Sequence, residues 1–218
     1  MEIPSITSKV LQTLRDKIIV GQLKSGRKLN ELDITKELGI SRPPLREALR
    51  ILEADHLVVS IPRKGTYVSE LSVKDFVEFS QTREMIECYC VDLLKKTNIR
   101  NLPKVQTALE KTQTLPVSLI TVDQEQSFHH IQVFLDFHRS LVKSTENSLL
   151  FNIYNSISHS LARYQYIYFH IEEAAQHSFD RHKKVFDLIN RGDFDQAKEE
   201  LRKHINYTVE LVKTRILY

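Results

Sequence analysis

Three histidines in the C-terminal half of the chain have neighbours suited to a metal site. His138, His182 and His204 each have apolar residues three or four positions away, so each imidazole lies on or beside the apolar side of a helix. Such sides face the interior of a helical bundle, where metal and ligand sites are built. Three converging imidazoles could bind a divalent transition metal such as Zn, Mn or Ni.

A second set of side chains, near the N-terminus, could bind DNA. Arg42, Arg46 and Arg50 repeat every four residues, so they share one helix face, away from the apolar stripe. Arginine on such a face binds guanine O6 and N7, or a phosphate. The alternative is a solvated face on which Glu47 pairs with Arg50.

The elements around these arginines predict a helix-turn-helix. Apolar spacing indicates a helix over 6–20, and Gly21 ends it. The stretch 23–30 is expected to be a turn. Asn30 begins a short helix that ends at Gly39, and Ser41 caps the next helix. In this motif the start of the second helix enters the major groove.

Two short strands are expected next, over 57–61 and 66–68, because the first is rich in β-branched residues. The turn between them would form the tip of a wing. Arg63 and Lys64 lie in that turn and could contact the DNA backbone or the minor groove.

Composition agrees with a soluble DNA-binding protein. Residues 1–70 hold 12 basic and 9 acidic residues, whereas residues 71–218 hold 19 of each, so all the excess positive charge lies in the first third. No apolar run approaches the length of a membrane span, and the start has no apolar signal core. The two cysteines, Cys88 and Cys90, suggest buried thiols in a reducing compartment. We therefore expect a cytoplasmic protein without membrane association.

From Ser72 onward the pattern is helical. The expected helices cover 73–97, 101–112, 123–144, 147–170, 172–191 and 194–216. The fold class is therefore mainly α, with a winged helix-turn-helix in residues 1–70 and an antiparallel all-helical bundle in residues 71–218.

The N-terminal part resembles the GntR family of transcription regulators. The matching residues are Gly26, Leu29 to Glu31, Leu38 to Arg42, Pro44 to Leu49, Leu52, Glu53, Leu57 and Gly65. The resemblance implies DNA contacts from Ser41, Arg42, Pro43 and Arg46 and from the wing around Gly65, to which Thr66 belongs. The sequence departs from the family at Leu32, where some relatives carry a DNA-contacting arginine.

The C-terminal part resembles the FCD domain of the FadR subgroup. The matching runs are Arg83 to Glu87, Phe137 to Leu141, Arg181 to Lys183 and Lys203 to Ile205. The resemblance implies a divalent metal on the three histidines, with a fourth ligand from an aspartate four residues before the first. Phe134 stands at that position, and Asp136 falls on a different helix face. Water or an effector carboxylate could complete the shell, or the metal could be lost.

In a domain of this type Arg83 is a buried or half-buried cation, which needs an anion. A carboxylate effector is a natural bidentate partner. The alternative is an ordinary ion pair with Glu87, one helical turn further on.

The sequence thus predicts a homodimeric transcription regulator, by default a repressor, that binds palindromic double-stranded operator DNA. A small organic acid in the helical domain controls its operator affinity. Three alternatives stay open: a metal-independent regulator of an apolar or acyl ligand, a three-histidine metalloenzyme, and a helical domain that only dimerises. The enzyme lacks support from any metalloenzyme motif such as H-E-x-x-H.

Overall fold

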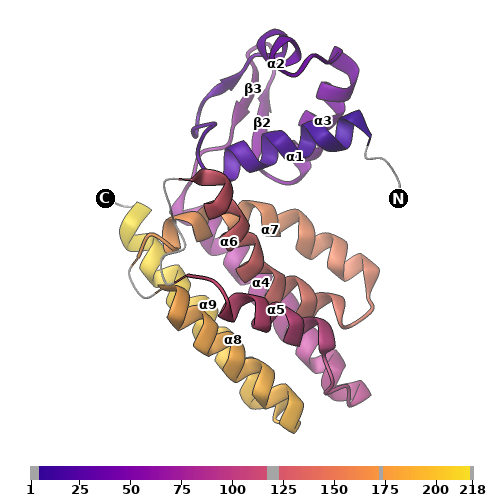
Figure 1. The fold of residues 1–218 in the computed structure, drawn as a ribbon, viewed down its shortest axis with the longest axis vertical. Helices are drawn as coiled ribbons and strands as arrows, with labels where there is room; N and C mark the ends of the chain where they lie inside the picture. Colours follow the sequence, from indigo (N-terminus) through magenta and orange to yellow (C-terminus); the bar gives the residue numbers. More distant parts are fainter. Residues whose placement is uncertain (1–4, 117–122, 172–173, 217–218) are drawn as a thin grey trace. The chain divides into compact units, whose positions relative to one another are not determined.

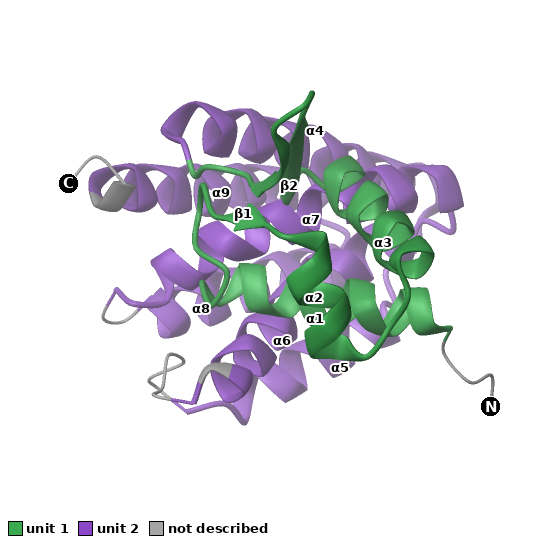
Figure 2. Cartoon of the chain, turned by 90° about the horizontal axis from the view of Figure 1, so that it is seen from above, with its two compact units in different colours: residues 1–71 green, residues 72–218 purple. Residues whose placement is uncertain are grey.

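The computed structural model describes residues 5–116, 123–171 and 174–216 (Figure 1). The chain divides into two compact units, residues 1–71 and 72–218, which Figure 2 colours separately. Mainly helical architecture, with one small sheet among the described residues, confirms the predicted fold class.

The first unit is a winged helix-turn-helix. Its elements, in chain order, are α1 (Ile6–Ile19), β1 (Lys28–Leu29), α2 (Glu31–Leu38), α3 (Arg42–Ala54), β2 (Val58–Ile61) and β3 (Gly65–Val68). The three strands are antiparallel in the order β1-β3-β2. Its core joins the apolar faces of the three helices to the inner face of the sheet, with Leu45, Ala48, Leu52 and Leu57 fully buried.

Local capping explains the turn between α2 and α3. The Asn30 side chain accepts a hydrogen bond from the backbone N–H of Leu32, and Gly39 ends α2 in the left-handed conformation, with φ of 63°. Ser41 is at the N-cap of α3, as predicted, but its side chain makes no capping hydrogen bond. The prediction was wrong on that contact, because Pro43 and Pro44 occupy the first turn and remove backbone donors.

The stretch 23–30 is not a simple turn. Lys28 and Leu29 form β1 and pair with Tyr67 and Thr66 of β3. A strand of two residues is too short to show an alternating pattern, so its sequence gave no β signal. The wing hairpin of β2 and β3 therefore belongs to a three-stranded sheet in which β3 is central.

The second unit contains α4 (Val73–Thr97), α5 (Pro103–Gln113), α6 (Gln124–Lys143), α7 (Ser148–Tyr168), α8 (Ala174–Arg191) and α9 (Phe194–Ile216). These bounds agree with the predicted helices to within about two residues; residues 172 and 173, at the predicted start of one helix, lie outside the described part. Phe76, near the start of α4, stacks on Tyr164, near the end of α7, at 4.5 Å. The two helices therefore run antiparallel.

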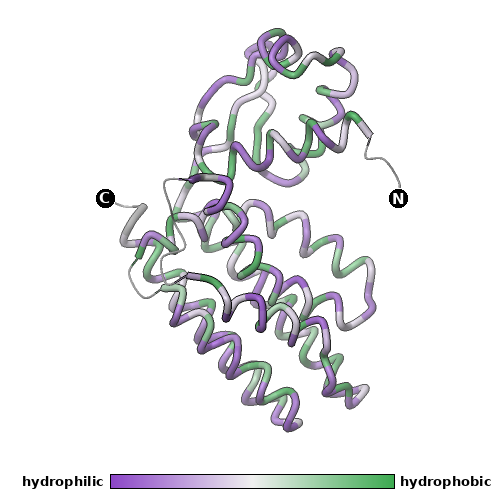
Figure 3. Tube along the Cα trace, viewed as in Figure 1, coloured by the Kyte–Doolittle hydropathy of each residue, from purple (hydrophilic) through white to green (hydrophobic). Residues whose placement is uncertain are grey.

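The bundle core is built from one apolar side of each helix. Phe137, Leu141, Val91 and Leu201 are fully buried in it. Apolar and polar segments alternate along the helices of the bundle in Figure 3, as expected of amphipathic helices. Cys88 and Cys90 are both buried free thiols. None of the described helices is long and apolar enough to cross a membrane.

Candidate functional site

The arginine face of α3 is exposed. Arg42, Arg46 and Arg50 all point to solvent, whereas Leu45 and Leu49 of the same helix are buried. The Arg46 side chain is 65% exposed although its Nε donates to Glu31 at 3.0 Å. Such an exposed ion pair contributes little, so it leaves Arg46 able to bind another anion.

Arg50 is more firmly engaged. Its Nε and Nη2 donate to the two carboxylate oxygens of Glu47 at 3.2 and 2.9 Å. The ion pair that the sequence offered as an alternative is therefore present at Arg50. It leaves Arg42 and Arg46, in the first turns of α3, as the arginines best placed for base contacts.

The wing tip is also exposed. Arg63, Lys64 and Gly65 lie at the turn between β2 and β3, and Thr66 is partly exposed. The backbone N–H of Lys64 donates to the carbonyl of Ile61 at 3.0 Å, which closes the turn. Arg63 has φ of 64°, a conformation uncommon for a residue with a side chain. The two basic side chains therefore project from a tightly turned tip.

The second unit brings its three predicted histidines together. His138 of α6, His182 of α8 and His204 of α9 are each 2% exposed. One ring nitrogen from each lies within 4.8 Å of the others. The Nε2 atoms of His182 and His204 are 3.2 Å apart. The Phe137 ring stacks on His182 at 4.2 Å and fixes its plane.

Burial sets the protonation of these rings. Burial, more than any neighbouring charge, lowers the pKa of all three well below 6.5, and the Arg83 guanidinium lowers it further. A neutral imidazole keeps one unprotonated ring nitrogen, whose lone pair can bind a metal ion. The Nδ1 atoms of His182 and His204 have no hydrogen-bond partner among the described residues, and unpartnered buried nitrogens are unusual.

Arg83 lies against the same cluster. Its Nε donates to Glu87 Oε1 at 2.8 Å, and both side chains of this α4 pair are almost completely buried. Glu87 Oε2 lies 3.0 Å from His138 Nδ1. Burial alone would lower the pKa of Arg83, but the Glu87 carboxylate raises it above the usual value. The ion pair weighed as an alternative thus forms, and it joins Arg83 to the histidines.

A very small cavity opens at the cluster. Its volume is about 10 Å³, and its lining includes Phe134, Phe169, Gln165 and Ser178 beside the three histidines. The Phe134 and Phe169 rings are 4.7 Å apart and close one side. This space is large enough for one ion or water molecule, and too small for an organic acid.

The residues present fit a single metal ion. Three neutral nitrogen donors converge in a buried interior, which suits Zn, Mn or Ni. The fourth side is apolar, because Phe134 lies there at 6.2 Å from His182, ring to ring. Asp136 is about half exposed and pairs with Arg139 at 3.7 Å instead. A fourth ligand would therefore come from water or an effector.

Sequence reasoning did not assign Gln165, Phe169 or Ser178 to the site. Gln165 and Phe169 belong to the aromatic-rich run 163–169, whose composition is compatible with core packing, with a pocket lining or with a dimer surface. Tyr164 and Tyr168 of this run are buried in the core. Ser178 gave no signal of its own, since a single serine on an amphipathic helix is unremarkable.

Two family models match the chain, one in each unit. Residues 6–68 match the family described as bacterial regulatory proteins, gntR family, and residues 78–207 match the FCD domain. The chain is a GntR-family regulator with an FCD domain. The family consists of transcription regulators, so the chain is a DNA-binding regulator and the metalloenzyme alternative finds no support.

Relatives of this GntR-family chain carry similar descriptions. The HTH-type transcriptional regulator YdhC of Bacillus subtilis is 27% identical over 92% of this chain and 88% of its own length. The gluconate operon transcriptional repressor of Bacillus licheniformis is 31% identical over 68% of this chain and 59% of its own length. Both are similar to this chain over more than two thirds of its length.

Solved structures share the fold. A transcriptional regulator, GntR, from Rhodococcus sp. RHA1 superposes with a TM-score of 0.76 at 22% identity, covering 97% of this chain and 99% of that one. McbR/YncC of Escherichia coli gives the same TM-score at 19% identity, covering 98% and 100%. At these identities the likeness extends to the fold alone.

Proposed function

We propose that this regulator is a cytoplasmic homodimeric repressor whose operator affinity is controlled by a small organic acid bound at Arg83, on a divalent transition metal held by His138, His182 and His204. The single observation that carries this proposal is the convergence of a buried guanidinium and three neutral imidazoles in one bundle interior. Arg83 and a bound metal together would carry more positive charge than the single Glu87 carboxylate balances, which calls for an anionic ligand.

The DNA-binding part of the proposal assigns operator contacts by position on the helix-turn-helix. Ser41, Arg42, Pro43 and Arg46, at the start of α3, would meet base edges and phosphates, and Arg50 a phosphate. The free hydroxyl of Ser41 supports this, because no capping bond occupies it. The wing residues Arg63, Lys64, Gly65 and Thr66 would follow the adjacent backbone or minor groove.

The effector part follows from charge. Arg83 would bind one carboxylate oxygen while the metal, when bound, supplies positive charge to the other as a Lewis acid. The cavity is too small for this ligand as it stands, so binding would require the lining to move. Parting Phe134 from Phe169 would open the side that these two rings close. Repacking of this kind would favour one arrangement of the helices over another and so shift the population of DNA-binding states.

The dimer part rests on exposed apolar side chains. Met85 and Tyr89 of α4 are 66% and 52% exposed, and Leu149 and Ile153 of α7 are 69% and 48% exposed. The Phe76–Tyr164 stack gives a common reference point on the two antiparallel helices. At the usual helical rise, each of the four exposed residues lies about 13 to 23 Å along its helix from that stack. We name these four residues the α4/α7 face. Apolar side chains gathered at one level of neighbouring helices mark an interaction surface, and a second copy would cover them.

The test is elemental analysis of the purified, tag-free protein before and after chelation, with thermal melting of each sample. We expect about one transition metal per chain and a lower melting temperature after its removal. Small carboxylates are then screened for further stabilisation and for release of operator DNA. His182→Ala serves as the site variant and His129→Ala, a change of an exposed histidine, as its matched control.

Two results would count against the metal. The first is a metal-free protein whose melting temperature does not rise when Zn, Mn or Ni is added. The second is a metal content that the change His182→Ala leaves unchanged. The first result would favour the metal-independent regulator of an apolar or acyl ligand, for which Phe134 and Phe169 offer a suitable lining. The second would mean that His182 is only a core residue and that the metal is held elsewhere.

A further inference from the structure

A large groove of the second unit lies apart from the histidine cluster. One cavity of about 460 Å³ opens between the start of α5, the end of α6 and the start of α7, and a second of about 370 Å³ adjoins it. Both are lined by Lys104, Lys143 and Phe151. We name the two together the α5–α7 groove. Its size is that of small-molecule sites, whereas the cavity at the histidines holds about 10 Å³.

The floor of the groove is apolar. Leu102 and Val105 are buried beneath it, and Ala108 continues the floor along α5. Phe151 stands partly exposed at the border of the two cavities. Ile99, 40% exposed, extends the apolar surface at one end. An apolar ligand body laid here would be covered on several sides.

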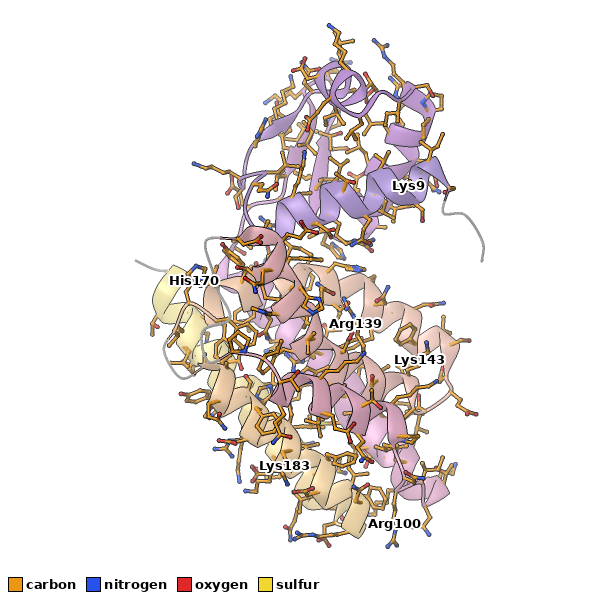
Figure 4. The ribbon with its side chains drawn as sticks, in the orientation of Figure 1. Lys9, Arg100, Arg139, Lys143, His170 and Lys183 are labelled. Carbon is orange, nitrogen blue, oxygen red and sulfur yellow. The ribbon has the colours of Figure 1, made fainter. Side chains whose placement is uncertain are left out.

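The rim of the groove is basic. Lys104, Lys111 and Lys143 line it, and none makes an ion pair within the described part of the chain. Lys143 instead holds its Nζ 5.6 Å from the centre of the Phe151 ring, in a cation–π contact. Figure 4 labels Lys143 and Arg139, one turn apart on α6.

Two carboxylates also line the groove and do not cancel this charge. Asp136 pairs with Arg139 at 3.7 Å, so the two are neutral together. Glu146 lies in the first cavity. Three lysines against one carboxylate leave a net positive rim. The N-cap of α5, Leu102, provides no side-chain capping bond, which leaves the N–H groups that follow Pro103 in the first turn as further donors.

We propose that the α5–α7 groove binds an organic anion with an apolar body, at a site separate from Arg83 and the histidines. The acidic head lies between Lys104 and Lys143, where both cavities meet. The body covers Phe151 and the floor formed by Leu102 and Val105. Lysines that make no ion pair among the described residues lie beside exposed apolar surface in this groove. An amphipathic anion complements both features, and neither feature alone would attract it selectively. This proposal goes beyond the proposed function and does not depend on it.

Titration calorimetry on the full-length protein tests this, with phenylacetate and phenyl phosphate as probes. Phenylacetamide lacks the charge and acetate lacks the apolar body, so both are negative probes. We expect one of the two anions to bind at least tenfold more tightly than its negative probes. Which of them binds more tightly identifies the acidic head as carboxylate or phosphate.

Variants then place the binding. Lys104→Gln with Lys143→Gln should weaken the bound anion about tenfold or more, because two charge-assisted contacts are lost. Lys183→Gln, which removes a lysine charge on α8, is the matched control and should leave affinity unchanged. Arg83→Gln with Glu87→Gln removes the guanidinium proposed to bind the effector and its counter-charge together, so no unpaired charge stays buried. This double change should also leave the affinity for the anion unchanged.

Three results would overturn the proposal. The first is that neither anion binds, and the second is that phenylacetamide binds as tightly as the anions. The third is an affinity for the anion that falls with the Arg83 and Glu87 changes but is unchanged by the double lysine change. The last result would assign the anion to the interior site and so support the proposed effector function while rejecting the groove.

Discussion

Arg83 and His138 are in direct contact: Nη2 of the guanidinium lies 2.6 Å from Nε2 of the imidazole and 2.9 Å from Nδ1. Since Glu87 Oε2 lies 3.0 Å from His138 Nδ1, a proton on Nδ1 leaves the lone pair on Nε2. Arg83 and a metal ion would therefore compete for the same lone pair. A carboxylate that drew Arg83 away would release His138 for the metal.

Metal and carboxylate should therefore bind cooperatively. We expect a saturating small carboxylate to raise metal affinity about 5- to 150-fold, the range of typical coupling free energies. Titration of metal-free protein with Zn or Mn, with and without acetate, measures the effect. In the Arg83→Gln, Glu87→Gln double variant the coupling should shrink toward the direct contribution of the carboxylate as a ligand. If acetate left the metal affinity of the native protein unchanged, the competition would be refuted.

The buried Arg83–Glu87 pair should respond unequally to single and double changes. Glu87→Gln leaves a buried guanidinium without its counter-charge, which costs about 3–5 kcal/mol of folding free energy. Arg83→Met with Glu87→Gln removes both charges and should cost much less. Urea unfolding of the two single variants and the double variant gives the coupling energy. Additive costs would mean that the two side chains do not interact.

Operator binding should depend on Arg46 more than on Arg50. Arg46→Ala should weaken specific operator binding by about 1–3 kcal/mol, the value of one bidentate base contact, and leave the dimer intact. Arg50→Ala should weaken it less, because Glu47 already accepts hydrogen bonds from two donors of that guanidinium, Nε and Nη2. Fluorescence anisotropy with operator and scrambled DNA measures both. Unaltered operator affinity in Arg46→Ala would exclude α3 as the base-reading helix.

Dimerisation should fail when charge enters the α4/α7 face. Met85→Glu with Tyr89→Glu would bury two carboxylates at a subunit contact, so we expect monomers in light scattering after size exclusion. Val59→Glu, a change of a 45%-exposed apolar residue in the first unit, is the control and should leave the dimer intact. Dimers of unchanged stability in the double variant would move the subunit contact elsewhere.

The two thiols should be inert in the native protein. Burial raises the pKa of Cys88 to about 11 and that of Cys90 to about 12, from the usual 9.0. At pH 8 less than about 0.1% of either is thiolate, the reactive form. Disulfide reagents should therefore label the folded protein far more slowly than the unfolded one. Because unfolded thiols ionise near pH 9 and folded ones do not, stability should also fall as pH rises above about 9. Rapid labelling of native protein at pH 8 would disagree.

The sequence predicted the helices of both units closely because their apolar spacing is regular and their ends carry strong signals. Asn30, Gly39 and the proline pair at 43–44 each mark a helix end by a specific backbone property. The strand at Lys28–Leu29 was missed for the opposite reason. Two residues form it only because β3 offers them hydrogen-bond partners, which is a tertiary effect.

The site was predictable in its residues but not in its contacts. Helical spacing placed the three histidines on inward faces, and the resemblance to the FCD domain implied a buried Arg83. It could not show that Arg83 reaches across to His138, 55 positions away, nor that Phe134 and Phe169 meet over the cavity. Those contacts depend on how the helices rotate and cross, which periodicity alone leaves open.

The ring contact between Phe134 and Phe169 also affects how fast an effector binds and leaves. An effector that enters the interior by parting these rings should bind at an observed association rate that levels off with concentration at the rate of that opening, well below the diffusion limit. Departure must pass the same obstacle. Such a regulator would respond with a delay and would hold its signal after the effector concentration had fallen, which makes it a filter of brief fluctuations.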